Sequence, residues 1–113
     1  MAEPKLVPGT LYIDRDQDLR TGAWGAYVKI GIVRNEKEAS NRTKEHQTGN
    51  PRRIHILHEV PAPMVENLET RLHHWFAEHW VIGEWFDMDE YFVNSQVIPK
   101  ALEMIETQVA SHG

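Results

Sequence analysis

The segment ETRLHHWF at positions 69–76 places a carboxylate, Glu69, one helical turn before a histidine, His73. Both residues lie at the border of an apolar helical stripe. That stripe consists of Val65, Leu68, Leu72, Trp75 and Phe76. A carboxylate at such a border can point into a groove beside the packed face and hold a divalent metal there. An isolated glutamate on the rim of an amphipathic helix is also common, so the position alone leaves both interpretations open.

Four further side chains suited to phosphodiester hydrolysis are expected off the packed faces of neighbouring elements. They are Tyr12, Lys29, Arg42 and His46. Hydrolysis needs a cation beside the phosphate, an acid or base for water, and a carboxylate for a divalent metal. Arg42 and His46 are one turn apart on a predicted helix and can address one phosphate together. A single carboxylate suits Mg²⁺, which retains several waters and borrows phosphate oxygens as ligands.

The seven histidines raise the alternative of a zinc, copper or nickel site. His55 and His58 are three apart on a predicted strand and therefore face opposite sides. His74 and His79 are five apart on a predicted helix and diverge by roughly 140°. These spacings favour surface or interfacial histidines over a histidine metal cluster.

Alternating hydrophobicity predicts the strands that position Tyr12 and Lys29. Residues 10–14 and 26–33 alternate with period two, which leaves both side chains on the uncovered faces. Residues 14–25 are polar and contain glycine, which predicts a long hairpin loop. A third strand is predicted over residues 53–60, and a turn with a short aromatic strand follows within residues 83–93.

Three helices are predicted between and after these strands. The first begins after Asn35 and ends near Gly49, the second runs from about Met64 to Trp80, and the third begins at Ser95. The inward positions of the third are Ala101, Leu102, Ile105 and Val109. The predicted fold is α+β, a small and mostly antiparallel sheet flanked by helices, in a single domain over residues 1–113.

Composition limits the class of protein. The 113 residues contain no cysteine, which excludes disulfides and cysteine-ligated zinc, and no apolar run approaches the ~20 residues of a membrane span. A cytoplasmic protein is therefore expected. The net charge of −5 argues against a nucleic-acid partner, but its distribution is uneven. Residues 29–53 carry a balance of +4 and residues 59–90 a balance of −7, which could mark a phosphate-facing surface beside a metal-binding one, or two ordinary solvated faces.

Several short motifs together resemble the GIY-YIG nuclease superfamily, in particular its phage-type branch with KIG as the second motif. They span residues 10 to about 90, with the C-terminal helix at about 95–110 outside them. The motifs are TLY at 10–12, KIG at 29–31, Arg42 followed by His46, QTGNPRR at 47–53, ETRLH at 69–73 and GEWF at 83–86.

This resemblance implies metal-dependent hydrolysis of DNA with Mg²⁺ or Mn²⁺ as cofactor. It implies that Tyr12 orients or deprotonates the attacking water and that Lys29 occupies the position of the second tyrosine. Arg42 and His46 would stabilise the phosphate, and Glu69 would bind the metal. Lys29 acts as a base only if its surroundings favour the neutral amine; otherwise it contacts the phosphate. We expect Lys44, Arg52 and Arg53 to guide the DNA backbone.

Departures from the pattern keep a second function open. Thr10 replaces a glycine, the second tyrosine is Lys29, and Asn94 is the only downstream asparagine for a position that many superfamily members fill. The alternative is a catalytically weak or inactive nucleic-acid-binding or protein-interaction module on the same fold. The acidic balance also suggests that the domain depends on a separate targeting domain or protein to find DNA.

Overall fold

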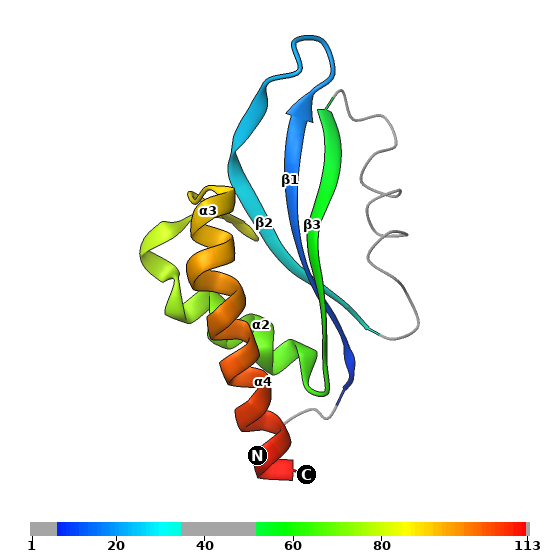
Figure 1. Ribbon diagram of the computed structural model, residues 1–113, viewed down its shortest axis with the longest axis vertical. Helices are drawn as coiled ribbons and strands as arrows, with labels where there is room; N and C mark the ends of the chain where they lie inside the picture. The colour runs from blue at the N-terminus through cyan, green and yellow to red at the C-terminus, as the bar shows by residue number, and fades with distance from the viewer. Residues whose placement is uncertain (1–6, 35–51, 113) are drawn as a thin grey trace.

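The computed structural model describes residues 7–34 and 52–112, and its centre is an antiparallel sheet (Figure 1). The long strands are β1 (Gly9–Asp18), β2 (Trp24–Arg34) and β3 (Arg52–Ala62), and the short ones are β4 (Trp80–Ile82) and β5 (Trp85–Phe86). Their order in the sheet is β3-β1-β2-β5-β4. The predicted α+β class and its mostly antiparallel sheet are confirmed. The helix predicted between Asn35 and Gly49 lies outside the described residues.

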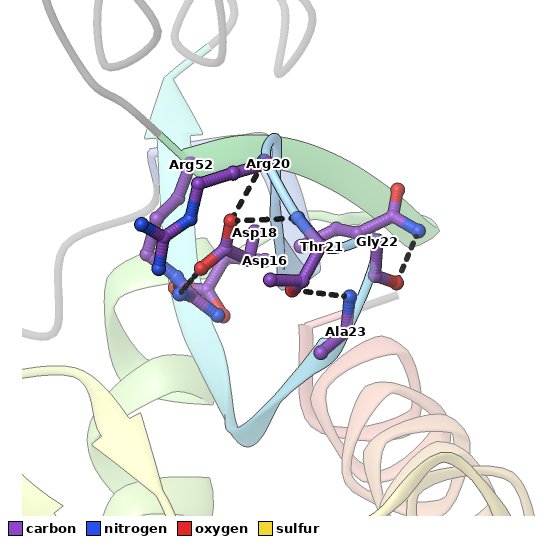
Figure 2. A network of polar contacts seen from close by, with 8 residues as sticks. Asp16, Asp18, Arg20, Thr21, Gly22, Ala23 and Arg52 are labelled. Carbon is purple, nitrogen blue, oxygen red and sulfur yellow. Dashed lines mark hydrogen bonds and ion pairs between the residues drawn. The ribbon is translucent and has the colours of Figure 1, made fainter.

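The long hairpin loop predicted over residues 14–25 is wrong, because β1 and β2 continue into this polar segment. The actual turn is short and closes on Asp18. The Asp18 backbone N–H donates to the Ala23 carbonyl at 2.8 Å, and its side-chain Oδ1 accepts from the N–H groups of Arg20 and Thr21 (Figure 2). Gly22 adopts a positive φ of 77° in this turn, which glycine permits at low cost. Polar cross-strand pairs thus extend the hairpin beyond its apolar residues.

Helix α2 (Val65–Trp75) packs on the sheet with Val65, Leu68 and Leu72 buried. The helix is shorter than predicted, because a 3₁₀ turn, η1 (Ala77–His79), follows it and the chain then enters β4. The prediction that Trp75 belongs to the inward stripe is also wrong. Trp75 is exposed, and the Lys100 ammonium lies 4.1 Å from the centroid of its ring.

The C-terminal helical segment begins earlier than predicted. Asp89 caps it by accepting from the Phe92 N–H at 2.8 Å, and the segment continues as α3 (Glu90–Phe92), a π-helical turn η2 (Val93–Val97) and α4 (Ile98–His112). On α4, Ala101 is buried as expected and Ile105 is half-buried, whereas Leu102 and Val109 are exposed. Met104 and Gln108 are buried in their place because the packed face lies further round the helix. None of the described helices combines the length and apolarity that crossing a membrane would require.

The main core lies between one face of the sheet and helices α2 and α4, which contact each other (Figure 1). Leu11, Ile13, Val28 and Ile30 form its sheet side. The other sheet face therefore carries the alternate residues of the same strands, among them Tyr12 and Lys29. Helix α2 contacts β2, so side chains at the border of the packed stripe of α2 can meet residues of this other sheet face.

Candidate active site

Glu69 of α2 meets a second acid, Glu84, in the turn that precedes β5. Burial is the main cause that raises the pKa of Glu69 to about 8, and the neighbouring Glu84 carboxyl raises it further. Its Oε2 atom is buried and has no hydrogen-bond partner among the residues that the structure describes. At neutral pH this side chain therefore carries a proton unless a cation compensates a second negative charge.

The position of Glu84 follows from how β5 joins the sheet. The Ile30 N–H donates to the Glu84 carbonyl at 2.9 Å, and Lys29 is paired with Trp85 in the register. Gly83, with a φ of 55°, provides the left-handed residue that turns the chain from β4 into this pairing. The backbone thereby fixes Glu84 beside Lys29, and Lys29 Nζ lies 3.8 Å from Glu84 Oε1.

Lys29 lies among several acidic groups. Its cross-strand partner is Asp14, it forms an ion pair with Glu84, and its charge also lowers the pKa of Glu69. Carboxyl groups this close favour the charged ammonium over the neutral amine. The surroundings therefore suit Lys29 to an electrostatic contact with phosphate better than to the role of a base.

Asp14 is a functional candidate that the sequence interpretation missed. It is only 1% exposed, and neither carboxyl oxygen has a hydrogen-bond partner within the described part of the chain. Burial raises its pKa to about 7, Lys29 lowers it, and Glu59 and Glu84 raise it further. Alternation from Tyr12 places Asp14 on the same face as Lys29, but Asp14 also begins the polar segment 14–25, whose composition predicts a loop. Glu84, the other missed acid, could not be found from hydrophobic alternation, because the turn before β5 determines its position.

Tyr12 is completely buried and packs with Val33 and Ile56, so the prediction that it lies on an uncovered face is wrong. It lies opposite Gly31 in the β1–β2 pairing, and the absence of a side chain there leaves room for its ring. A β-carbon at Gly31 would lie 2.5 Å from Tyr12 Oη and 3.0 Å from Glu84 Oε2. The phenol end and the Glu84 carboxylate therefore occupy the same small space, which suits Tyr12 to positioning Glu84 more than to contact with substrate.

Replacing Gly31 with alanine should destabilise the fold by about 1–3 kcal/mol, because overpacking outweighs the better strand propensity of alanine. The added carbon would clash with Tyr12 Cζ at 2.6 Å as well as with the hydroxyl. Urea unfolding measures the loss. In a Tyr12→Leu background the same change should cost much less, since the clashing atoms are absent. Equal costs in the two backgrounds would contradict the close packing of Tyr12 on Gly31.

His73, one turn after Glu69, attaches α2 to the sheet. Its Nε2 donates to the Ile30 carbonyl at 3.0 Å, and its ring packs edge-on against Phe86 with centroids 4.9 Å apart. The Ile30 residue thus contacts Glu84 through its N–H and His73 through its carbonyl. This bond holds the helix at the β2 edge, so that Glu69 faces Glu84.

The remaining predicted site residues fall in different places. Arg42, Lys44 and His46 lie outside the described residues. Arg52 forms an ion pair with Asp16, with Nε 2.9 Å from Oδ2, and its Nη1 lies 3.7 Å from Asp18 Oδ2 (Figure 2). Arg53 is exposed and forms no ion pair with a carboxylate in the described part of the chain. Asn94, the candidate for the additional asparagine position, has its Oδ1 2.6 Å from His58 Nε2 instead.

Comparison with known families decides what this chain is related to. The model of the T5orf172 domain matches residues 9–106, which is most of the chain. The chain belongs to the T5orf172 domain family. This match corrects the assignment to the GIY-YIG superfamily, because the T5orf172 domain is a different family. The GIY-YIG motifs are short, and two of them depart from their pattern at Thr10 and Lys29, so they carry less weight than a match along the chain.

The T5orf172 domain is phage-associated and is often linked to nuclease or DNA-binding activity. No curated protein and no solved structure matches this T5orf172 chain. The family assignment therefore supports a function related to nuclease or DNA-binding activity.

Proposed function

We propose that this T5orf172 domain hydrolyses phosphodiester bonds in DNA with a divalent cation, Mg²⁺ or Mn²⁺. The observation that carries the proposal is the Glu69–Glu84 carboxyl pair with Lys29 beside it. Two carboxyl groups that share a partly buried position favour either a proton or a cation between them. A neighbouring ammonium suits a substrate that brings its own negative charge, such as a phosphodiester.

The donor set of the described residues fits Mg²⁺ or Mn²⁺ better than zinc. The described part of the chain contains no group of three or more acids or histidines that could enclose a metal. Glu69 and Glu84 could hold Mg²⁺, because this ion keeps several waters and takes substrate oxygens as its other ligands. The orphaned Oε2 of Glu69 fits a ligand role. When bound, such an ion polarises a phosphate oxygen and stabilises the leaving oxygen.

The chain's own residues would supply the remaining parts of the site. Lys29 would offset the charge that develops on the phosphate as water attacks phosphorus. Tyr12 would hold the Glu84 carboxylate in place through its packing on Gly31. Arg42 and His46 are proposed to stabilise the phosphate. The proposed contacts to the DNA backbone come from Lys44, Arg52 and Arg53. For Arg52, contact with DNA would compete with its ion pairs to Asp16 and Asp18.

A second candidate function is a nucleic-acid-binding module without catalysis. The observation that favours it is the ion pair of Lys29 with Glu84, which neutralises the site in the absence of a metal. Such a module would bind nucleic acid equally well with EDTA and with Mg²⁺, whereas a nuclease would cleave only with the metal.

Plasmid cleavage tests the proposal directly. Supercoiled plasmid is incubated with a molar excess of the protein in Mg²⁺, in Mn²⁺ and in EDTA, and nicked and linear products are quantified on gels. The excess of protein compensates for the weak DNA affinity expected from the net charge of −5. We expect nicking with either metal and none with EDTA. A folded protein that binds the plasmid but leaves it intact in both metals would contradict hydrolysis and support the binding module.

A further inference from the structure

The hairpin that joins β1 to β2 projects beyond the helices (Figure 1). Trp24, the first residue of β2, lies beside this hairpin and is exposed. The Arg15 guanidinium lies 4.8 Å from the centroid of the Trp24 ring, and the His55 ring centroid lies 4.8 Å from that of Trp24. Gln17 Oε1 lies 3.1 Å from His55 Nε2 and fixes the imidazole from the other side. Arg53 lies opposite Gln17 in the β1–β3 pairing. We define the hairpin platform as the surface formed by Arg15, Trp24, Arg53 and His55.

The hairpin platform is a continuous surface made by three strands. Arg15 is paired with Val28 on β2 and with His55 on β3, and Gln17 is paired with Trp24 and Arg53. Val28 belongs to the main core, so these side chains continue the core face of the sheet past the point that the helices cover. The ring contacts hold Trp24 in place although it is 46% exposed. A partly exposed aromatic ring in contact with Arg15 and His55 is therefore presented to solvent.

The charge of the hairpin platform is positive, and no carboxylate in the described part of the chain pairs with it. Within the described residues, neither Arg15 nor Arg53 forms an ion pair with a carboxylate. The acids of the same hairpin, Asp16 and Asp18, instead pair with Arg52 (Figure 2). The polar network of the turn thus neutralises its own carboxylates, while Arg15 contacts Trp24 and Arg53 lies across Gln17 on β3.

We propose that the hairpin platform binds single-stranded nucleic acid, with an unpaired base stacked on Trp24 and phosphates on Arg15 and Arg53. Bases expose their flat faces for stacking only when the strand is unpaired, and stacking on an aromatic ring beside cations is the usual basis of such binding. The charge favours a polyanion over an apolar protein partner. The platform shares Arg53 with the backbone contacts proposed above, but its binding of a single strand does not depend on hydrolysis.

A neighbouring pocket limits the path that the phosphates of a bound strand can take. A cavity of about 300 Å³ lies next to the platform, where Ala26 is two residues after Trp24 on β2. It is lined by Ala26, His79, Asp87, Met88, Asp89 and Phe92. The carboxylates of Asp87 and Asp89 repel phosphate, so the backbone of the strand would run along the Arg53 side and a base would face the cavity.

Fluorescence anisotropy with a short fluorescein-labelled oligothymidine in EDTA tests this surface without any cleavage. Replacing Trp24 with alanine should weaken binding roughly 5- to 150-fold, the range that loss of one stacked base produces. Trp24→Phe should retain most of the affinity, because phenylalanine also stacks. Arg53→Ala should lower the slope of log affinity against log salt by about 0.7 in magnitude, as expected for losing one phosphate contact on a single strand.

The matched control is the pair of Trp75 and Lys100, a second exposed tryptophan beside a cation. Here Lys100 also forms an ion pair with Glu103 at 3.1 Å, so its charge is compensated and Trp75→Ala should leave binding unchanged. Equal affinity of parent and Trp24→Ala, equal weakening by Trp75→Ala, or tighter binding of a matched duplex than of the single strand would each overturn the proposal. So would failure of the folded parent to bind the oligothymidine. Cleavage is not read out, so failure of the hydrolysis proposal leaves this result intact.

Discussion

Replacing Glu69 with glutamine is expected to reduce metal-dependent plasmid cleavage at least ~100-fold while the domain stays folded. The loss follows because a neutral amide holds a divalent cation less well than a carboxylate, and without the cation the negative charge that develops on the phosphate is not offset; single electrostatic groups of this kind contribute about 10²–10³ in rate. The fold should survive because Glu69 borders the packed stripe of Leu68 and Leu72 and does not belong to it. Cleavage rates and circular dichroism spectra of parent and variant provide the comparison.

Two further variants separate a metal role from a general effect of charge. Glu106→Gln removes one exposed acid from α4 and should leave cleavage unchanged. Glu84→Gln should also abolish cleavage, since this residue forms the pair with Glu69 and contacts Lys29. If the Glu69→Gln protein cleaved plasmid at the parental rate in Mg²⁺, the carboxyl pair would not be the metal site.

The sequence predicted the sheet well because its apolar residues alternate. Leu11, Ile13, Val28 and Ile30 all lie in the core, as their period of two indicates. The hairpin was underestimated because polar residues from Arg15 to Asp18 carry no hydrophobic signal, although cross-strand pairs and the Asp18 turn keep them in strand geometry. Pattern reasoning detects burial, and this part of the sheet is held mainly by polar contacts and backbone hydrogen bonds.

Prediction from the hydrophobic pattern also fails at the borders of the packed helix faces. The stripe of α2 was predicted correctly at Leu68 and Leu72 but not at Trp75, because Lys100 of α4 provides an exposed partner for the tryptophan ring. On α4, the buried Gln108 hydrogen-bonds the backbone carbonyl of Met64, a contact that no periodicity indicates. Such partners come from other elements of the fold and are invisible in a single segment.

The candidate site was predictable only in part. Glu69 stood out because a carboxylate at a stripe border is unusual enough to question, and the alternation of β2 placed Lys29 off the core. Glu84 and Asp14 could not be joined to them, since that requires the β2–β5 pairing and the strand character of residue 14. The acids that set the electrostatics of the site therefore became visible only with the tertiary arrangement.

The stability of the metal-free domain should fall as the pH rises from about 4 to 8. Burial raises the pKa of Asp14 from 3.8 to about 7, so between these values the folded state holds a proton that the unfolded state has released. Stability decreases with pH wherever the folded state binds more protons. The Asp14 contribution is lost between about pH 4 and pH 7, and that of Glu69 between 4.5 and about 8.

Asp14→Asn should remove most of the pH-dependent stability that Asp14 contributes, which amounts to about 4 kcal/mol at most for a pKa shift of ~3 units. The buried amide carries no charge at any pH, but it needs hydrogen-bond partners of its own, so the absolute stability of the variant is a poor measure. The difference between variant and parent at several pH values is informative because that fixed cost cancels. We expect urea unfolding in EDTA to show the variant gaining on the parent from pH 5 to 8, with the Glu106→Gln control parallel to the parent. An Asp14→Asn curve that also ran parallel would mean that Asp14 is ionised in the folded protein at neutral pH, with Lys29 compensating its charge across the β1–β2 pairing.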